Sequence, residues 1–360
     1  MKIILTFGTR PHFIKLFPLI KELKKNKINY LLVHTGQHYS FVLDKIFFQD
    51  LHLAQPKYDL KVGSGSQAYQ TAEIIFGLEK ILLKEQPNLV MSEGDTNSDL
   101  ATALTSNKLL IPYGHIEAGL RSFDREMPEE INRIVADHLS EYLFAPTKVS
   151  QVNLLKEGIE SKKIFVVGNL IVDAVYQSVK LAEKKSKILS KLHLKKNGYF
   201  LVTAHRQENV DNKEKLSGIL KGLELLFKEF HLPVIYSLHP RTKMRIKEFK
   251  LKIPSGIKFI EPVGYFDFLK LEANSLLILT DSGGIQEESS ILRKPCVTLR
   301  ENTERPETIA VGSNMLAGTN PWKIVKVVKV MLKKQKTWPN PFGDGKTAKR
   351  IVQLIKNLKE

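Results

Sequence analysis

The stretch KIILTFGTRPHFIK, residues 2–15, decides how this chain folds. Its first six residues are mostly apolar, which predicts a buried strand over Lys2–Phe7. A Gly8-Thr9 turn follows, and Pro11 stands in the first turn of a helix, where the missing N–H of proline costs nothing. A helix over Pro11–Lys24 completes a strand–turn–helix unit, the building block of parallel α/β folds.

The same alternation runs along almost the whole chain. In the first half, we expect further strands over Tyr30–His34, Leu89–Ser92, Leu109–Gly114 and Tyr142–Ala145, and helices over Ser66–Glu85, Thr96–Lys108 and Glu129–Glu141. In the second half, we expect strands over Tyr199–Thr203, Pro233–Ser237, Lys258–Ile260, Leu276–Thr280 and Cys296–Leu299. Regular alternation of this kind predicts parallel sheets with helices on both faces.

A chain of 360 residues is long for a single core. A lysine-rich helical segment, Val172–Lys196, separates the two halves. We therefore predict an α/β protein of two doubly wound Rossmann-like domains, residues 1–171 and 172–345, with the active site in the cleft between them. The last helix, in residues 346–360, has no following strand, and we expect it to pack back on the N-terminal domain.

Composition restricts the partners and the cellular location. The one cysteine, Cys296, excludes an internal disulfide and a cysteine-based metal site, and it fits a reducing compartment. The N-terminal apolar run is too short for a signal peptide, and no apolar run is long enough to cross a membrane. We therefore expect a cytoplasmic protein with no membrane partner. Histidine spacing resembles no zinc site, so no metal is expected.

The formal net charge of +17 could indicate a nucleic-acid partner. However, the lysines alternate with aliphatic residues at helical spacing, as on the solvent face of amphipathic helices. No basic stretch is interleaved with aromatic residues. We expect no nucleic-acid partner.

Charged residues follow several of the expected strands, which is where open α/β sheets hold their ligands. The stretch GHIEAGLR, residues 114–121, continues to PEEINR, residues 128–133. Its acids can exchange protons, and its arginines can hold an anion or lower the pKa of an acid. The alternative is a solvated helix start with ion pairs.

The stretch DSGGIQEE, residues 281–288, follows a strongly apolar strand. Ser282 can cap the next helix, and Gly283 and Gly284 let backbone N–H groups approach a diphosphate. Glu288 lies further along that helix and could accept hydrogen bonds from sugar hydroxyls. The alternative is a capped helix with exposed acids. The pattern differs from the dinucleotide fingerprint G-x-G-x-x-G, which argues against NAD.

Candidate site residues also follow three other expected strands. Arg10 and Lys15 flank the first helix start and make an anion site plausible, although an ordinary turn with surface cations has the same pattern. Asp95 follows the strand that begins at Leu89, and it could equally cap the next helix. His205 follows the strand over Tyr199–Thr203.

Taken together, these motifs resemble the non-hydrolysing UDP-N-acetylglucosamine 2-epimerases. The matching pieces span the chain in order and are residues 8–11, 35–38, 94–96, 115–121, 128–133, 205–206, 281–288 and 303–307. The resemblance implies a fold of the glycosyltransferase-B type, a homodimer, and interconversion of UDP-N-acetylglucosamine and UDP-N-acetylmannosamine. It also implies anti elimination of UDP to a 2-acetamidoglucal and syn re-addition, with no cofactor.

The family's functional residues carry over position by position. Asp95, Glu117 and Glu129 match the acid–base carboxylates, and His205 is placed with the catalytic groups. The UDP-sugar is expected to contact a set from both domains: Arg10, Lys15, Ser282, Gly283, Gly284, Glu288 and Arg305.

Some positions depart from that family. His12 replaces the usual Glu, and Tyr113 and residues 238–242 look more like a sister branch. That branch acts on UDP-2,3-diacetamido-2,3-dideoxyglucuronate and is the alternative function. Residues 303–307 instead look like the N-acetylglucosamine branch. A hydrolysing epimerase and a glycosyltransferase of the same fold are further alternatives.

Overall fold

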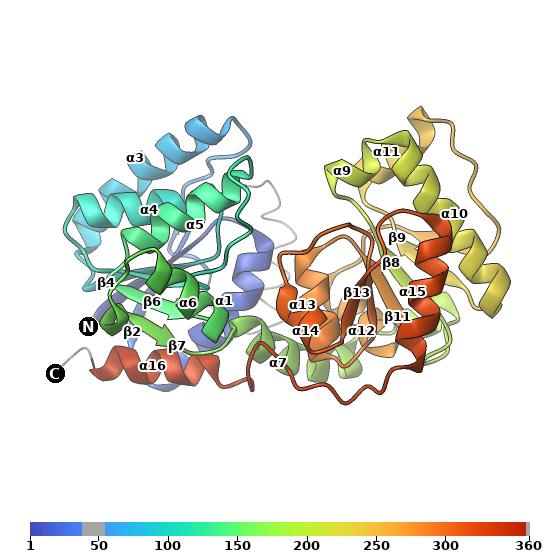
Figure 1. Ribbon diagram of the computed structural model, residues 1–360. Coiled ribbons are helices and arrows are strands. Elements are labelled where there is room, and N and C mark those ends of the chain that lie inside the picture. Colours follow the sequence, from blue (N-terminus) through green and yellow to red (C-terminus); the bar gives the residue numbers. More distant parts are fainter. Residues whose placement is uncertain (38–54, 358–360) are drawn as a thin grey trace. The chain divides into compact units, whose positions relative to one another are not determined.

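The computed structural model describes residues 1–37 and 55–357, apart from the side chain of Arg10. The chain divides into two compact units (Figure 1). The first unit comprises Met1–Ala174 and Phe342–Glu360, and the second comprises Val175–Pro341. Helix α7 (Leu170–Lys185) begins in the first unit and continues into the second. No helix within the described residues is long and apolar enough to span a membrane.

The described part of the first unit holds a seven-stranded sheet in the order β3-β2-β1-β4-β5-β6-β7. All neighbouring strands are parallel. The strands are β1 (Lys2–Phe7), β2 (Asn29–His34), β3 (Tyr58–Asp59), β4 (Leu89–Glu93), β5 (Tyr113–Ile116), β6 (Tyr142–Ala145) and β7 (Ile164–Val166).

Helices connect these strands. They are α1 (Arg10–Lys25), α3 (Gln67–Glu85), α4 (Asn97–Lys108), α5 (Pro128–His138), α6 (Lys148–Lys156), the short 3₁₀ helix η1 (Ser161–Lys163) and α16 (Thr347–Asn357). Prolines stand at the first positions of α1 and α5, where no intrahelical N–H is needed. The C-terminal helix α16, red in Figure 1, packs against α1, and Lys356 Nζ donates to Asn26 Oδ1 at 2.7 Å.

The described second unit holds a six-stranded parallel sheet in the order β10-β9-β8-β11-β12-β13. The strands are β8 (Phe200–Thr203), β9 (Val234–Ser237), β10 (Ile257–Ile260), β11 (Leu277–Thr280), β12 (Cys296–Thr298) and β13 (Asn314–Leu316). The helices are α8 (Ile188–Leu192), α9 (Gln207–Val210), α10 (Lys213–Phe230), α11 (Pro240–Glu248), α12 (Tyr265–Asn274), α13 (Gly283–Ile291), α14 (Pro306–Ala310) and α15 (Pro321–Lys333).

Amphipathic helices cover each sheet. In α10, the apolar positions Leu216, Ile219, Leu223 and Leu226 recur every three or four residues, and all four side chains are buried. They join the strands β8, β9 and β11 and helix α15 in one core. This packing fixes the strand ends, and therefore the loops that follow them.

Strand order reverses once in each sheet. In the first unit the chain places β2 on one side of β1 and β4 on the other; in the second, β9 and β11 flank β8 in the same way. The loops after β1 and β4, and those after β8 and β11, therefore lie at topological switch points, where α/β proteins hold ligands.

Most predicted elements agree with the structure within one or two residues, but the strand expected over Leu109–Gly114 is wrong. Helix α4 runs to Lys108, and β5 begins only at Tyr113. Between them Leu110 has φ +56° and is 92% exposed, because it reverses the chain after the helix. The short strands β3, β7 and β13 were not expected. The lysine-rich segment breaks between α7 and α8, where Ser186 Oγ donates to Asp267 Oδ1 at 2.5 Å.

Candidate active site

Lys15 of α1 contacts two buried carboxyl groups at the carboxyl ends of strands β4 and β5 in the first unit. Its Nζ lies 2.8 Å from Oε1 of Glu93, the last residue of β4. It also lies 2.8 and 2.7 Å from the two carboxylate oxygens of Glu117, which follows β5. Asn169 Nδ2 donates to Glu117 Oε1 at 2.8 Å. Glu93 and Glu117 are only 1% and 6% exposed, so the sequence-predicted residues Lys15 and Glu117 do come together.

The backbone at this edge is unusual at two positions. Glu117 has φ +73°, a conformation that a residue with a side chain rarely adopts. Gly94 has φ +105°, and a Cβ there would lie 2.8 Å from His12 Nε2. Only glycine therefore fits between β4 and His12. This backbone conformation is unfavourable for Glu117, and it persists because the surrounding structure holds it. Strained residues of this kind cluster at functional sites.

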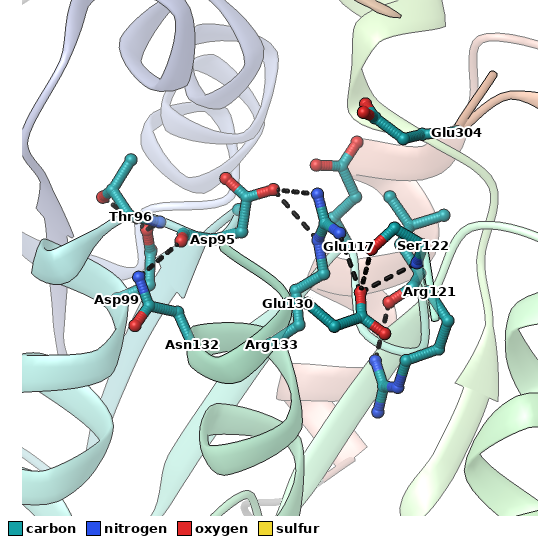
Figure 2. A network of polar contacts seen from close by, with 12 residues as sticks. Asp95, Thr96, Asp99, Glu117, Arg121, Ser122, Glu130, Asn132, Arg133 and Glu304 are labelled. Atoms are coloured by element: carbon teal, nitrogen blue, oxygen red, sulfur yellow. Dashed lines mark hydrogen bonds and ion pairs between the residues drawn. The ribbon is translucent and has the colours of Figure 1, made fainter. Parts of the chain in front are cut away.

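Asp95 is held by a cation from another element. Arg133 of α5 donates to Asp95 Oδ2 through Nε at 3.0 Å and through a terminal nitrogen at 2.5 Å, and Asn132 Nδ2 donates to the Asp95 carbonyl at 2.9 Å (Figure 2). Burial raises the pKa of Asp95, but the charge of Arg133 outweighs it, so the pKa lies below its usual value. Asp95 does not cap α4, because Thr96 occupies that position and forms a capping box with Asp99.

A second acid organises the neighbouring loop. Asp137 accepts from His115 Nδ1 at 2.6 Å and from the Gly119 N–H at 3.1 Å, and its Oδ2 lies 2.7 Å from Arg121. His115 Nε2 lies 2.8 Å from the Gly94 carbonyl oxygen. Burial lowers the pKa of His115, but the charge of Asp137 raises it by a larger amount. The pKa of His115 therefore lies above its usual value. His115 and Arg121 therefore support the loop that carries Glu117.

The adjacent acids of α5 have different surroundings. Glu130 is 1% exposed and accepts from the N–H groups of Ser122 and Phe123 at 2.8 and 3.1 Å and from Arg133 at 3.1 Å (Figure 2). Glu129, in the first turn of the helix, is exposed. The buried member thus fixes the preceding loop, and the exposed one is accessible to a ligand.

The second unit places a helix start at its switch point. Ser282 is the N-cap residue of α13, but its side chain makes no capping hydrogen bond, contrary to the sequence prediction. Among the described atoms, nothing outside the local helix backbone lies within 4 Å of a Cβ built on Gly284, and a Cβ on Gly283 would make only ordinary contacts. The fold itself therefore does not require glycine here. The bare backbone N–H groups of a helix start favour an anion.

Asp281 fixes the loop that carries His205. This buried carboxylate accepts from the N–H groups of His205 and Arg206, both at 2.9 Å, and from Asn209 Nδ2 at 3.1 Å. The His205 ring stacks on His239 at a centroid distance of 5.4 Å. Burial lowers the pKa of His205, with the Asp281 charge opposing that shift.

Arginines surround Glu304 near α14. Arg305 Nε donates to Glu287 Oε1 at 2.7 Å, and Arg300 and Arg206 lie 3.2 and 3.5 Å from the carboxylate of Glu304. Charge from Arg206, Arg305 and Arg300 outweighs burial and holds the pKa of Glu304 below its usual value. The second unit therefore concentrates cations close to the α13 start, since Gly283 lies in contact range of Arg305.

Glu288, which the sequence assigns to a ribose, is 7% exposed. Its charge acts on the fully buried Glu272 of α12 and on Tyr265. Burial, and then the charge of Glu288, raises the pKa of Glu272 well above its usual range.

Some residues of the site were not predicted from the sequence, and some predicted ones lie outside the part of the chain that the structure describes. Glu93 belongs to the charged stretch that follows the strand beginning at Leu89, but it was not predicted as a site residue. Asn169 and Asp137 lie in segments without a motif, so no sequence signal marks them. The side chain of Arg10 and residue His38 lie outside the described part of the chain. Within that part, no group of three or more His, Cys, Asp or Glu side chains is arranged to hold a metal ion.

Known proteins resemble this chain along its whole length. The family model described as UDP-N-acetylglucosamine 2-epimerase matches residues 21–356. The UDP-N-acetylglucosamine 2-epimerase of Methanocaldococcus jannaschii is 54% identical over 361 residues, covering 99% of this chain and 99% of that protein. The UDP-2,3-diacetamido-2,3-dideoxy-D-glucuronate 2-epimerase of Pseudomonas aeruginosa is 38% identical, covering 99% of this chain and 100% of that protein.

A solved structure agrees with these relatives. The crystal structure of the M. jannaschii UDP-GlcNAc 2-epimerase in complex with UDP-GlcNAc and UDP superposes with a TM-score of 0.91 at 54% identity, covering 99% of this chain and 100% of that one. The predicted fold class, with two doubly wound α/β domains, and the predicted family are both confirmed. The chain belongs to the UDP-N-acetylglucosamine 2-epimerase family, a family of isomerases.

Proposed function

We propose that this protein interconverts UDP-N-acetylglucosamine and UDP-N-acetylmannosamine by anti elimination and syn re-addition of UDP. The observation that carries the proposal is Glu117, a buried carboxylate aimed by Lys15 and Asn169 at the switch point of the first sheet. The bound M. jannaschii relative, with UDP-GlcNAc and UDP in its crystal structure, supports the substrate.

The two units divide the work in this proposal. The first supplies the acid–base groups Asp95, Glu117 and Glu129, and the second binds UDP. In this proposal the diphosphate of UDP contacts Ser282, Gly283 and Gly284, with Arg305 nearby. The ribose of UDP contacts Glu288. The bare helix start and the arginines of the second unit support this assignment. Arg10, Lys15 and His205 complete the substrate contacts.

The chemistry explains why so many acids are needed. A carboxylate removes the weakly acidic C2 proton while the C1–O bond breaks and UDP leaves with the bonding electrons. UDP then re-forms the C1–O bond to the glucal, and a carboxylic acid returns a proton to the other face of C2. Arg133 keeps Asp95 ionised, which a proton acceptor requires, but the lowered pKa also makes Asp95 a weaker base. The cations in contact with the nucleotide stabilise the leaving diphosphate.

Turnover in heavy water tests the proposal. Incubation with UDP-N-acetylglucosamine is expected to place deuterium at C2 of both epimers. Accumulation of free UDP and free sugar would instead indicate a hydrolysing enzyme, and transfer to an added acceptor a glycosyltransferase. Exchange should fall by about 10²–10⁴-fold in Glu117→Gln, the usual contribution of a proton-transferring group, with UDP binding retained.

The sister substrate is the second candidate. The P. aeruginosa relative named for UDP-2,3-diacetamido-2,3-dideoxy-D-glucuronate matches over 99% of this chain. His12, buried beside Asp99 with Nδ1 3.7 Å from its Oδ2, lies close to Gly94 at the site. A parallel heavy-water assay with that sugar decides between them: exchange with it alone would replace the first proposal.

We also propose a homodimer. Helix α3 exposes Tyr69, Phe76 and Leu83, which are 52, 61 and 59% accessible and follow one another at seven-residue spacing on one side. A second copy covering this stripe would bury it. Light scattering should give twice the chain mass, and Phe76→Glu should shift the mass to that of one chain; an unchanged mass would rule out this stripe.

A cytoplasmic location is proposed on the single, buried cysteine, Cys296, which fits a reducing compartment. Recovery of the activity in the cytosolic fraction of the source cells would agree with it, and recovery outside the cell would refute it.

A further inference from the structure

Glu93 is a buried acid that the proposed reaction leaves without a role. It ends β4, and its side chain is 1% exposed. Its Oε1 lies 2.8 Å from Lys15 Nζ, and among the described residues neither carboxyl oxygen has any other hydrogen-bond partner. A buried carboxylate normally collects several donors, because an ionised group without them is costly to desolvate.

At this position one lysine lies between two buried acids. Lys15 faces Glu93 on one side and both oxygens of Glu117 on the other. Asp99, on α4, adds a further negative charge toward Glu93. Around Glu117, Asp95 is compensated by Arg133 and His12. Among the described side chains, Lys15 is a cation that contacts both Glu93 and Glu117.

The two acids differ in the donors they receive. Glu117 accepts two contacts from Lys15 and one from the amide of Asn169, and these favour a carboxylate. Glu93 receives one contact and keeps an oxygen buried without a partner. Burial raises the pKa of Glu93 well above its usual range; the charges of Glu117 and Asp99 add to this, and Lys15 opposes it. When two acids share one cation, the less solvated acid holds the proton.

We propose that Glu93 is a positioning residue that works as a neutral carboxylic acid: it accepts from Lys15, fixes the lysine against Glu117, and leaves the full lysine charge to that carboxylate. The role rests on the proposed function, in which Glu117 exchanges the C2 proton. Glu93 itself neither touches the substrate nor changes its protonation during turnover. A second ionised acid would draw Lys15 away from Glu117, so activity is lost when Glu93 ionises.

Infrared difference spectra test the protonation state without any turnover. Wild type minus Glu93→Gln should show the C=O band of a protonated carboxyl group at neutral pH. Glu85→Gln is the control, because Glu85 is an acid of the same unit, 8% exposed, whose pKa is lowered to about 2 by Lys57 and Tyr58. Absence of the band from the Glu93 spectrum, or its presence in the Glu85 spectrum as well, would overturn the proposal.

Kinetic variants test the positioning role. Glu93→Gln keeps the shape and the acceptor but not the charge, so kcat should stay within about threefold and the alkaline limb of the pH profile should disappear. Glu93→Leu removes the acceptor, and kcat should fall by about 10–100-fold through misplacement of Lys15. Circular dichroism and UDP binding verify that each variant is folded. A folded Glu93→Gln without activity, or a fully active Glu93→Leu, would refute the role. If neither sugar reacts with wild type, the proposed function fails, and the infrared result still decides the protonation of Glu93.

Discussion

In each unit one buried aspartate fixes a loop of the proposed site, but the two aspartates accept hydrogen bonds from different kinds of donor. Asp137 in the first unit is bound by His115, Arg121 and one backbone N–H. Asp281 in the second unit is bound by two backbone N–H groups and an asparagine amide. Both carboxylates are at most 1% exposed. One loop is thus fixed by an aspartate with charged partners, and the other by an aspartate with neutral amide donors.

This difference has an energetic meaning. A carboxylate with cationic partners forms a buried ion pair, and removing one member leaves an uncompensated charge. A carboxylate with amide partners leaves only neutral donors without acceptors. The first loop should therefore be more sensitive to mutation and to pH than the second.

The largest effect is expected for Asp137→Ala. It removes the acid that His115 and Arg121 share, although Arg121 keeps its pairing with Glu157. The free energy of unfolding should fall by about 3–5 kcal/mol, the usual cost of breaking a buried pair. Urea unfolding followed by the far-UV signal measures it, because both tryptophans, Trp322 and Trp338, belong to the second unit. A loss below that of an exposed ion-pair control such as Asp211→Ala would break the comparison, because Asp211 pairs with Arg241 and Arg245 at the surface.

Asp281→Ala should cost less, about 2–4 kcal/mol, because three neutral donors lose their acceptor. The loop that carries His205 would lose its anchor, so UDP affinity should fall as well. Calorimetric titration with UDP, beside the same unfolding measurement, tests both. A cost above that of Asp137→Ala would show that the charges in the first unit are not what makes its loop sensitive.

The two histidines should give the units opposite pH dependence. The pKa of His115 is raised when folded, so its stabilisation is complete below the unfolded value of about 6.5 and is lost as pH rises through the folded value. The pKa of His205 is lowered when folded, so stability is instead lost as pH falls below that unfolded value. Its 40% exposed side chain makes the second effect the smaller one.

Unfolding curves between pH 5 and 9 would show these two opposite trends. Substituting His115 by Gln should remove the alkaline loss from the first unit, and substituting His205 by Gln the acid loss from the second. If the stability of both units in wild type changed in the same direction with pH, the opposite roles of the two histidines would be wrong.

The smallest effect on stability is expected at a glycine. Gly284→Ala meets open space and should leave the free energy of unfolding within about 0.5 kcal/mol, whereas UDP affinity falls because a methyl group covers the helix start. Gly94→Ala is the contrasting variant in the first unit. Its φ of +105° and the nearby His12 should cost about 1–3 kcal/mol. Unchanged UDP binding in Gly284→Ala would remove the diphosphate from this position.

The sequence predicts the sheets well because buried parallel strands are continuous apolar runs, and residues after them must share an edge. Lys15, Asp95 and Glu117 were identified on that basis together with the family motifs. The roles of Asp137 and Asn169 were not predictable, because each acts through a partner far away in sequence that only the folded chain brings close. The break between α7 and α8 was missed because Ser186 ends the helix through a hydrogen bond to the distant Asp267.

The path of the chain has a consequence during synthesis. The first unit is built from Met1–Ala174 and Phe342–Glu360, so the second unit is inserted within it. A ribosome adds about 5–20 residues per second, so α1 waits for tens of seconds before α16 leaves the exit tunnel. Throughout that time the surface of α1 that finally meets the buried Ile351, Val352 and Ile355 side of α16 is uncovered. The inserted unit is therefore synthesised before α16, the helix that completes the unit begun first.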